Sequence, residues 1–276
     1  MAAASLIHTC MASPAGADVN AYLVETSKGV VGVDSMLTVS DSRALRRRVD
    51  ALGKPLLAVL LTHSHPDHYG GLNELVGDDE VPIIATQGVH DVIRRDDEVK
   101  ESILRPMFGD EWAQQRMFPN TVVTDGETVE FDGMRFSVLD LGPSESPHDS
   151  PWLLGDDERV VFLGDQIYDH KHCYLADGFY AEWLANIETM RDRFPADAVF
   201  YIGHGGPVGP ERWSWQRDYI ERFIDAVSRA DWAQPDEAKA SVIAVMKEYE
   251  PSDDLQFLME LSIEPVAARL GLLTPA

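Results

Sequence analysis

The first two hundred residues alternate short apolar runs with polar turns, a pattern typical of a layered α/β domain. The run over 56–61 has no polar interruption, so it predicts a strand that is buried on both faces. Glycine, proline and aspartate separate the runs and predict turns between them. The expected strands are 21–24, 30–34, 56–61, 82–85, 121–124, 127–131, 134–139, 152–154, 160–163 and 198–202.

Longer segments carry apolar residues at helical spacing and predict helices. Residues 89–118 predict helical pieces broken at Pro106 and Gly109, within an inserted cap at about 87–118. Further helices are expected over 40–52, 181–194 and much of 211–276. The chain is therefore predicted to form an α/β domain over 1–210 and a helical extension over 211–276 that packs on the same domain.

Side chains that bind metals follow two of the buried strands. Four of them lie within six residues directly after 56–61, in the segment Thr62-His63-Ser64-His65-Pro66-Asp67-His68. Another histidine, His204, follows strand 198–202. Ligands gather beyond the carboxyl ends of strands in layered α/β folds, and imidazole and carboxylate groups suit zinc as well as iron or manganese. The sequence therefore predicts a metal site nucleated by His63, His65, Asp67 and His68.

The pattern His-x-His-x-Asp-His after a buried strand resembles the metallo-β-lactamase superfamily. Leu163-Gly164-Asp165 is similar to the segment that carries the family's bridging aspartate, and Ile202-Gly203-His204-Gly205 to that of its last ligand histidine. The resemblance extends over most of residues 5–210. It implies a four-layer αβ/βα sandwich with the metals at one edge between the sheets, here with a helical insertion and a helical C-terminus.

The resemblance implies two divalent metal ions, with zinc the first expectation and manganese or iron the alternatives. His63 and His65 would hold the first ion. The second ion, and its bridge to the first, would depend on Asp67, His68, His204 and Asp165. Such ions lower the pKa of bound water, which makes hydroxide available near neutral pH. Asp67 would then act as a ligand, a proton shuttle or both.

One position departs from the family pattern. The family's third histidine of the first site usually lies in Gly-His-Thr/Ser-Pro-Gly, but the matching stretch here is Gly142-Pro143-Ser144-Glu145-Ser146-Pro147-His148. Glu145 takes the ligand position and would make the first site harder, which favours manganese or iron. Two alternatives stay open: His148 enters through a changed loop, or the first site is weakened and the protein is a binding module or a one-metal enzyme. We favour Glu145.

The segment after the aspartate, Gly164-Asp165-Gln166-Ile167-Tyr168, resembles the acyl-homoserine lactone lactonase branch. Tyr168 matches the tyrosine that helps to polarise the ester carbonyl there, and its phenol would donate to a developing oxyanion; an ordinary packed tyrosine is the alternative. Apolar side chains of the cap and the C-terminal helices are expected to line the substrate pocket: Met107, Phe108, Trp112, Phe118, Trp213 and Trp215.

The favoured function is a metal-dependent hydrolase that uses a metal-bound hydroxide to cleave an ester, lactone or thioester-like bond of a small molecule. Hydrolysis of a β-lactam, sulfate ester or phosphoester is the nearest alternative. An iron-dependent oxidoreductase or dioxygenase shares the fold, and a non-catalytic binding protein with an altered first metal site is the remaining class.

Composition narrows the partners. The net charge of −24 would repel a nucleic-acid backbone, which excludes nucleic-acid partners. No apolar run approaches the roughly 20 residues of a membrane span, and the N-terminus does not read as a secretory signal, which predicts a cytoplasmic protein. Two cysteines, Cys10 and Cys173, cannot build a Cys-rich zinc module or a disulfide framework. The helical C-terminus would serve either as a homodimer surface or as a lid.

Overall fold

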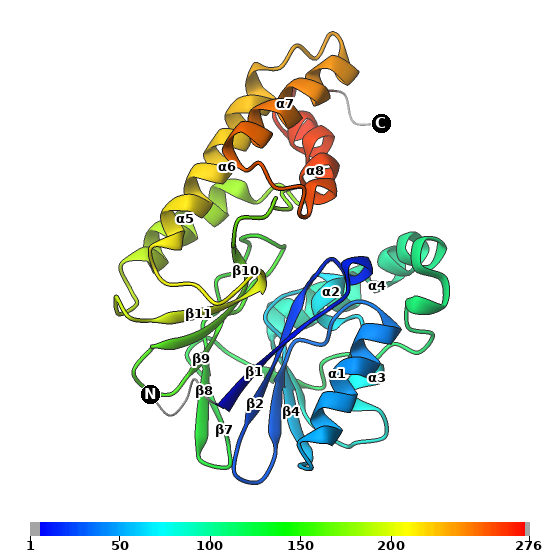
Figure 1. Ribbon diagram of the computed structural model, residues 1–276, viewed down its shortest axis with the longest axis vertical. Coiled ribbons are helices and arrows are strands. Elements are labelled where there is room, and N and C mark those ends of the chain that lie inside the picture. Colours follow the sequence, from blue (N-terminus) through cyan, green and yellow to red (C-terminus); the bar gives the residue numbers. More distant parts are fainter. Residues whose placement is uncertain (1–5, 274–276) are drawn as a thin grey trace.

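The computed structural model describes residues 6–273, and they form two β-sheets packed face to face (Figure 1). The first sheet has the strand order β1-β2-β3-β4-β5-β6, with β1–β3 paired antiparallel and β3–β6 paired parallel. Its strands are β1 Ile7–Met11, β2 Asn20–Glu25, β3 Val30–Val33, β4 Leu56–Leu60, β5 Ile83–Thr86 and β6 Thr121–Val123.

The second sheet has the order β11-β10-β9-β8-β7, with only β10 and β11 paired parallel. Its strands are β7 Thr128–Phe131, β8 Met134–Val138, β9 Trp152–Leu154, β10 Val160–Tyr168 and β11 Val199–His204. Apolar side chains from both sheets meet in one buried cluster, which includes Val31, Leu60, Phe136 and Phe162. This cluster is the central interface of the sandwich, and its burial drives the two sheets together.

Helices cover the outer faces of both sheets, which gives four layers. The helices are α1 Val39–Ala51, α2 Pro66–Tyr69, α3 Leu72–Val76, α4 Gln87–Phe108, α5 Tyr180–Arg191, α6 Arg212–Arg229, α7 Pro235–Tyr249 and α8 Gln256–Arg269. α1, α3 and α4 share a buried cluster with the first sheet, through residues such as Leu45, Leu72 and Ile93. The predicted αβ/βα sandwich with a helical insertion is therefore confirmed.

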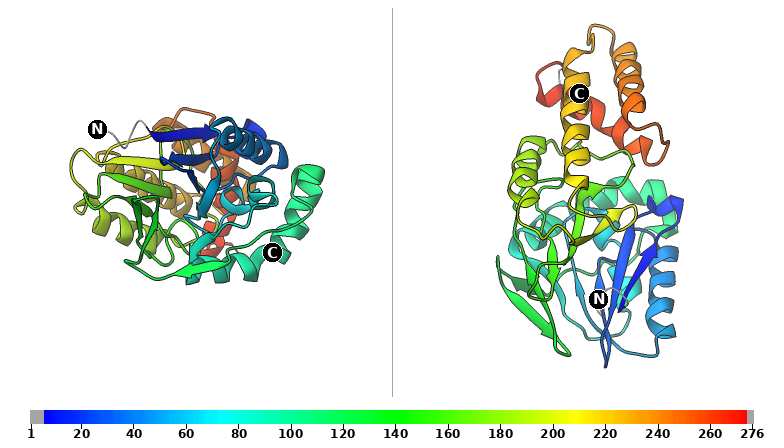
Figure 2. Two further views of the ribbon diagram at one scale, coloured as in Figure 1. Left: turned by 90° about the horizontal axis from the view of Figure 1, so that it is seen from below. Right: turned by 60° about the vertical axis from the view of Figure 1, so that its left-hand side comes forward.

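The C-terminal helices α6, α7 and α8 rise above one edge of the two sheets (Figures 1 and 2). They share a single buried cluster with α5 and the second sheet, in which Phe223 of α6 and Met259 of α8 belong with Trp183 and Phe200. The expected helical extension is thus present and packs against the strands through apolar contacts. The boundary between the two parts at residue 210 stays a prediction.

Two elements differ from their expected bounds. α4 continues through Pro106 and ends at Phe108, because the proline lies in the last turn and costs few helical hydrogen bonds there. β10 continues past Leu163 to Tyr168, because an irregular register at Gly164 lets the strand pass the motif without ending. Gly164 has φ +59, and a Cβ there would lie 2.7 Å from Thr62 Oγ1. Only glycine therefore fits this close approach of β10 to the strand end of β4.

Candidate metal centre

The predicted metal ligands lie at one edge of the sandwich, beneath the C-terminal helices. The segment 62–68 follows β4, and Pro66 occupies the first turn of the short helix α2, where its missing N–H costs nothing. His204 is the last residue of β11, and Asp165 belongs to β10, the neighbouring parallel strand. Glu145 comes from the loop between β8 and β9. Strand ends of both sheets therefore converge on one place.

Seven of the predicted residues form two adjacent groups in which the candidate ligand atoms all lie within 4.8 Å of one another. The first group is His63, His65 and Glu145, and the second is Asp67, His68, Asp165 and His204. The groups adjoin each other, because the ring centroids of His63 and His68 are 4.0 Å apart. Asp67 is the most exposed of the seven, with 18% of its side chain accessible, against 9% for His65.

Glu145 takes the third position of the first group. Its Oε2 lies 3.0 Å from His65 Nδ1 and 3.8 Å from His63 Nε2. His148 lies elsewhere: its Nε2 is 2.6 Å from Asp140 Oδ1, and its ring packs against Gly88 at the start of α4. Of the two loop residues considered from the sequence, the structure brings Glu145 to the first group and directs His148 away from it.

Asp165 lies between the histidines of the second group. Its Oδ1 is 3.4 Å from His68 Nε2, and its Oδ2 is 3.2 Å from His204 Nε2. Asp67 Oδ2 lies 3.3 Å from the same nitrogen of His204. Two carboxylates thus lie close to two imidazole nitrogens, a donor set suited to a divalent cation.

The other nitrogen of each histidine ring is held by a hydrogen bond. His68 Nδ1 donates to Asp34 Oδ2 at 2.8 Å, and His65 Nε2 donates to Asp177 Oδ2 at 2.8 Å. The remaining two rings donate from Nδ1, His204 to the carbonyl of Ala17 and His63 to the hydroxyl of Thr62. Such partners fix the orientation of a metal-binding imidazole and raise its basicity.

Asp34 organises both groups at once. Its Oδ2 accepts from His68 and also from the hydroxyl of Thr62, which in turn accepts from His63. Sequence reasoning did not assign this role to Asp34, although the residue ends a predicted strand directly. Asp177 was also missed, since it lies in the segment before α5 and nothing in its sequence context links it to His65.

Five polar atoms that face the interior of this centre are buried and make no hydrogen bonds within the described part of the chain. None of the following has a hydrogen-bond partner among the described residues: His63 Nε2, His68 Nε2, Glu145 Oε2, Asp165 Oδ1 and His204 Nε2. Buried polar atoms normally have partners, because leaving one unpaired costs about 1–3 kcal/mol. Five such atoms directed at one place fit the binding of metal cations, so the donor set agrees with the ions that the sequence implies.

The ionisation of the carboxyl groups reflects burial and neighbouring charge. Burial raises the pKa of Glu145 to about 8, although the charge of His65 acts in the opposite direction. Burial also acts to raise the pKa of Asp165, but the charges of His204 and His68 outweigh it and hold that pKa well below its ordinary value. A bound cation would favour the ionised form of each carboxylate.

Tyr168 contacts both groups from the end of β10. Its buried hydroxyl lies 2.9 Å from Asp165 Oδ2 and 3.1 Å from Glu145 Oε1, and it can donate its proton to either. Its ring stacks on that of His204 with centroids 5.2 Å apart. The tyrosine therefore belongs to the centre, while its role as an oxyanion donor stays a prediction.

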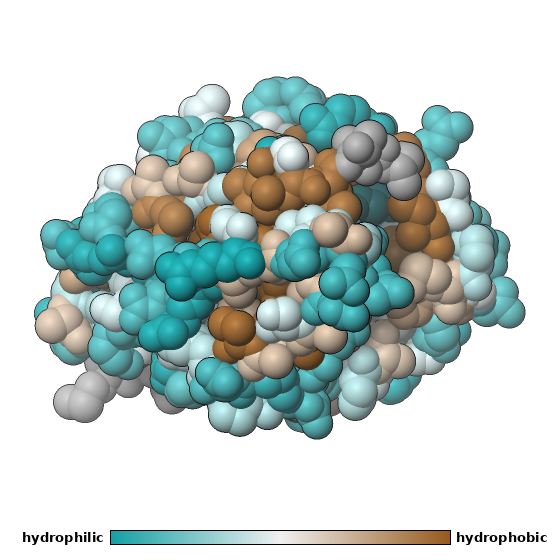
Figure 3. All heavy atoms as spheres, turned by 90° about the horizontal axis from the view of Figure 1, so that it is seen from above, coloured by the Kyte–Doolittle hydropathy of each residue, from teal (hydrophilic) through white to brown (hydrophobic). Residues whose placement is uncertain are grey.

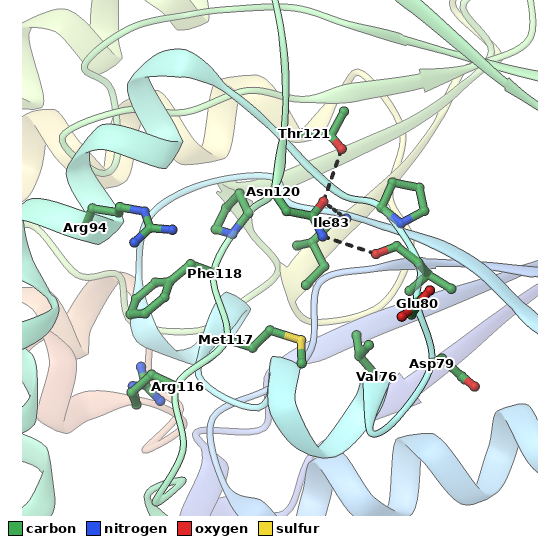
Figure 4. A pocket seen from close by; sticks show the side chains of 13 residues that line it. Val76, Asp79, Glu80, Ile83, Arg94, Arg116, Met117, Phe118, Asn120 and Thr121 are labelled. Carbon is green, nitrogen blue, oxygen red and sulfur yellow. Dashed lines mark hydrogen bonds between the residues drawn. The ribbon is translucent and has the colours of Figure 1, made fainter.

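Several residues expected around the substrate lie elsewhere. Trp112 and Trp213 are fully buried core residues, so the expectation that they line a substrate pocket was wrong. Phe118 lines a separate open cavity of about 750 Å³ beside β5 and β6, with Arg94 and Met117 (Figure 4). None of the seven candidate ligands lines this cavity. Aromatic residues are frequent in cores, and their positions along the chain did not distinguish packing from substrate contact.

The match to known proteins agrees with this geometry. The model of the metallo-beta-lactamase superfamily matches residues 15–204, from the segment before β2 to the last histidine of the centre. The chain belongs to this superfamily.

In the described part of the chain, no helix has both the length and the apolar character needed to span a membrane.

Individual relatives are distant. A hydroxyacylglutathione hydrolase of Prochlorococcus marinus (strain MIT 9301) is 26% identical over 184 residues, which cover 66% of this chain and 63% of that protein. A linear primary-alkylsulfatase of Pseudomonas sp. (strain ATCC 19151) is 24% identical over 222 residues, which cover 67% of this chain and 41% of that protein. The match thus spans less than two thirds of the length of either relative.

A solved structure shares the fold over nearly the whole chain. A metallo-beta-lactamase family protein of Thermus thermophilus superposes with a TM-score of 0.69 at 20% identity. The superposition covers 97% of this chain and 93% of that one. The shared architecture therefore includes the C-terminal helices as well as the sandwich.

Proposed function

We propose that the protein is a metal-dependent hydrolase that cleaves an ester, lactone or thioester-like bond of a small molecule. The observation that carries the proposal is the pair of adjacent ligand groups, whose inward-facing atoms are buried and lack hydrogen-bond partners among the described residues. Two divalent cations bound there would polarise the scissile carbonyl and lower the pKa of a water molecule.

The residues divide between two ions. The first would be held by His63, His65 and Glu145, and the second by Asp67, His68 and His204, with Asp165 shared between them. We propose zinc for both ions. The carboxylate of Glu145 makes the first group harder than three histidines would be, so manganese or iron is the alternative there.

The least buried ligand is placed to serve the substrate. Asp67 lies at the start of α2, and its side chain is the most exposed of the seven. A carboxylate in this position can accept a proton during attack and return it to the leaving group. We therefore propose Asp67 as both ligand and proton shuttle.

Tyr168 has two roles in this proposal. Its hydroxyl lies within hydrogen-bonding distance of the carboxylates of Asp165 and Glu145 and orients whichever one accepts its proton. The same hydroxyl would turn to a developing oxyanion when the substrate occupies the centre. A hydrogen bond from the phenol stabilises an oxyanion most strongly where water is excluded, and Tyr168 is fully buried.

The nature of the bond is supported by the relatives. The match to a hydroxyacylglutathione hydrolase favours a thioester or a similar carbonyl compound. The match to a linear primary-alkylsulfatase makes a sulfate ester the second candidate. Partners beyond a small-molecule substrate, the homodimer and the cytoplasmic location stay predictions.

A hydrolysis panel tests the proposal. The metal-loaded protein would be assayed against a lactone, an aryl ester, a thioester, an alkyl sulfate and a β-lactam, with His68→Ala as the matched inactive control. We expect hydrolysis of at least one carbonyl substrate by the wild type and its loss in the variant. Hydrolysis of the alkyl sulfate alone would select the second candidate, whereas equal rates for wild type and variant on every substrate would refute the proposed site.

A further inference from the structure

One face of α4 exposes apolar side chains to solvent. Val99, Ile103 and Met107 are 58%, 51% and 68% exposed, and they follow one another at intervals of four residues. Residues at this spacing lie on the same face of a helix, and eight residues span about 12 Å. An apolar stripe of this length on a chain with a net charge of −24 is a candidate binding surface.

α8 carries a second stripe. Phe257 and Leu261 are four residues apart and exposed to a similar degree. Met259 and Ile263, on the other side of α8, belong to the buried cluster shared with α6 and α7. The stripe of α8 is therefore on the side that turns away from the other two C-terminal helices.

The two stripes border a hollow. Seen from above, hydrophobic side chains gather over α8 and over α4, with a hollowed region between them (Figure 3). α8 lies above the metal edge of the sheets, and α4 extends along the same edge (Figures 1 and 2). The apolar surfaces thus form two walls rather than one flat face.

The backbone beneath α8 leads to the metal centre. The segment 169–179 runs beneath α8, where the amide of Leu175 donates to Ser262 Oγ at 2.7 Å. Two residues further on, Asp177 accepts from His65, a member of the first ligand group. α8 is therefore hydrogen-bonded to the segment whose Asp177 orients His65.

A positive charge lies beside this segment. Arg269, the last residue of α8, packs against Gly178, and its guanidinium carbon lies 5.7 Å from the ring centroid of Phe179. Gly178 directly follows Asp177, the partner of His65. Arg269 forms no ion pair within 4.0 Å in the part of the chain that the structure describes. The end of α8 thus places a positive charge next to the segment that reaches the metal centre.

From these observations we infer that the substrate is an amphiphile whose alkyl or acyl chain lies between α4 and α8 while its polar head reaches the metal centre. The inference rests on the proposed function, because it takes the metal centre as the place of reaction. A thin chain can enter between two facing walls, whereas the flat face of a second copy would contact only their rims. The charge of Arg269 complements a negatively charged head.

Binding of carboxylates of increasing length tests the inference. Metal-loaded protein would be titrated with acetate, hexanoate and decanoate by isothermal calorimetry. We expect each added methylene to raise the affinity by about two- to fourfold, the gain for partial to full removal of a methylene from water. Ile103→Asp and Leu261→Asp should abolish this dependence on chain length. Val245→Asp is the matched control, since Val245 is a 41% exposed apolar residue of α7 outside both stripes.

Three results would overturn the inference. One is equal affinity for hexanoate and decanoate, and another is an unchanged length dependence in both stripe variants. The third is a concentration-dependent dimer, dissociated by Ile103→Asp, in protein that shows no length dependence, because a second copy would then cover the stripes. Binding is measured without turnover, so length-dependent binding without hydrolysis of any panel substrate would refute the proposed function and leave the binding surface in place.

Discussion

Replacing Glu145 by glutamine removes the charge of the first ligand group and preserves its shape. The carboxylate lies 3.0 Å from His65 Nδ1 and is fully buried, so no solvent can replace it. Two unit charges 4 Å apart interact by about 4 kcal/mol at an effective dielectric of 20, and a divalent cation at ligand distance interacts more strongly. The loss of at least this energy lowers metal affinity about a thousandfold. Glu145→Gln should therefore lose the first ion and retain the second.

The assay is metal content by inductively coupled plasma mass spectrometry after dialysis against a weak chelator. We expect about two ions per chain in the wild type and about one in Glu145→Gln. His148→Ala is the control and should keep both ions, because His148 is paired with Asp140 outside the centre. Full metal content in Glu145→Gln, or equal losses in the two variants, would refute the assignment of the first group.

The same variant has a signature in metal-free protein. The pKa of Glu145 is raised to about 8 from 4.5, so the folded chain retains a proton that the unfolded chain releases at lower pH. The contribution of Glu145 to the free energy of unfolding is therefore fully present below pH 4.5. It is lost as the pH rises towards 8. Urea unfolding of metal-free Glu145→Gln should show a weaker decline of stability over this range than the wild type. An equal or steeper decline would contradict the shift.

Three further substitutions test the surroundings of the centre. Asp177→Asn should lower metal affinity at the first group about 10- to 100-fold, because it weakens the hydrogen bond that orients His65; competition with a fluorescent chelator measures this, and unchanged affinity would contradict it. Tyr168→Phe should lower kcat about 10²- to 10³-fold at unchanged metal content, if the phenol donates to the oxyanion; a matching loss of metal would show that it mainly orients carboxylates. Gly164→Ala should lower the free energy of unfolding, measured in urea, by at least twice the roughly 1 kcal/mol expected for Gly126→Ala. Both glycines have positive φ, but only Gly164 lies against other atoms. Equal costs would show that the close approach to β4 does not constrain this position.

The sequence could bring the candidate ligands together because their signal is local. Four candidate ligands lie within six residues after one buried strand, and the remaining ones follow the expected order along the chain. Glu145 could be aligned by its neighbours Ser146 and Pro147, which preserve part of the family pattern. The structure then separated Glu145 from His148, which the sequence alone left open, because the direction of a loop depends on what it packs against.

The residues that orient the candidate ligands could not be predicted from the sequence, because they depend on tertiary contacts. Asp177 reaches His65 across 112 positions of the chain, and no local pattern marks such a pair. His172 is likewise held by Tyr219 and the carbonyl of Ser252, which lie far from it along the chain. The buried tryptophans were misjudged for the same reason, since an aromatic residue on an amphipathic helix looks alike whether it faces a core or a ligand.

Metal content of the wild-type protein, purified without chelator, decides whether the proposed centre binds two ions. We expect about two divalent ions per chain, zinc first, bound by the two ligand groups at the edge of the sandwich. A single iron ion would contradict the dinuclear hydrolase and favour chemistry with dioxygen. The absence of tightly bound metal, even after reconstitution with zinc, manganese and iron, would contradict the metal centre itself.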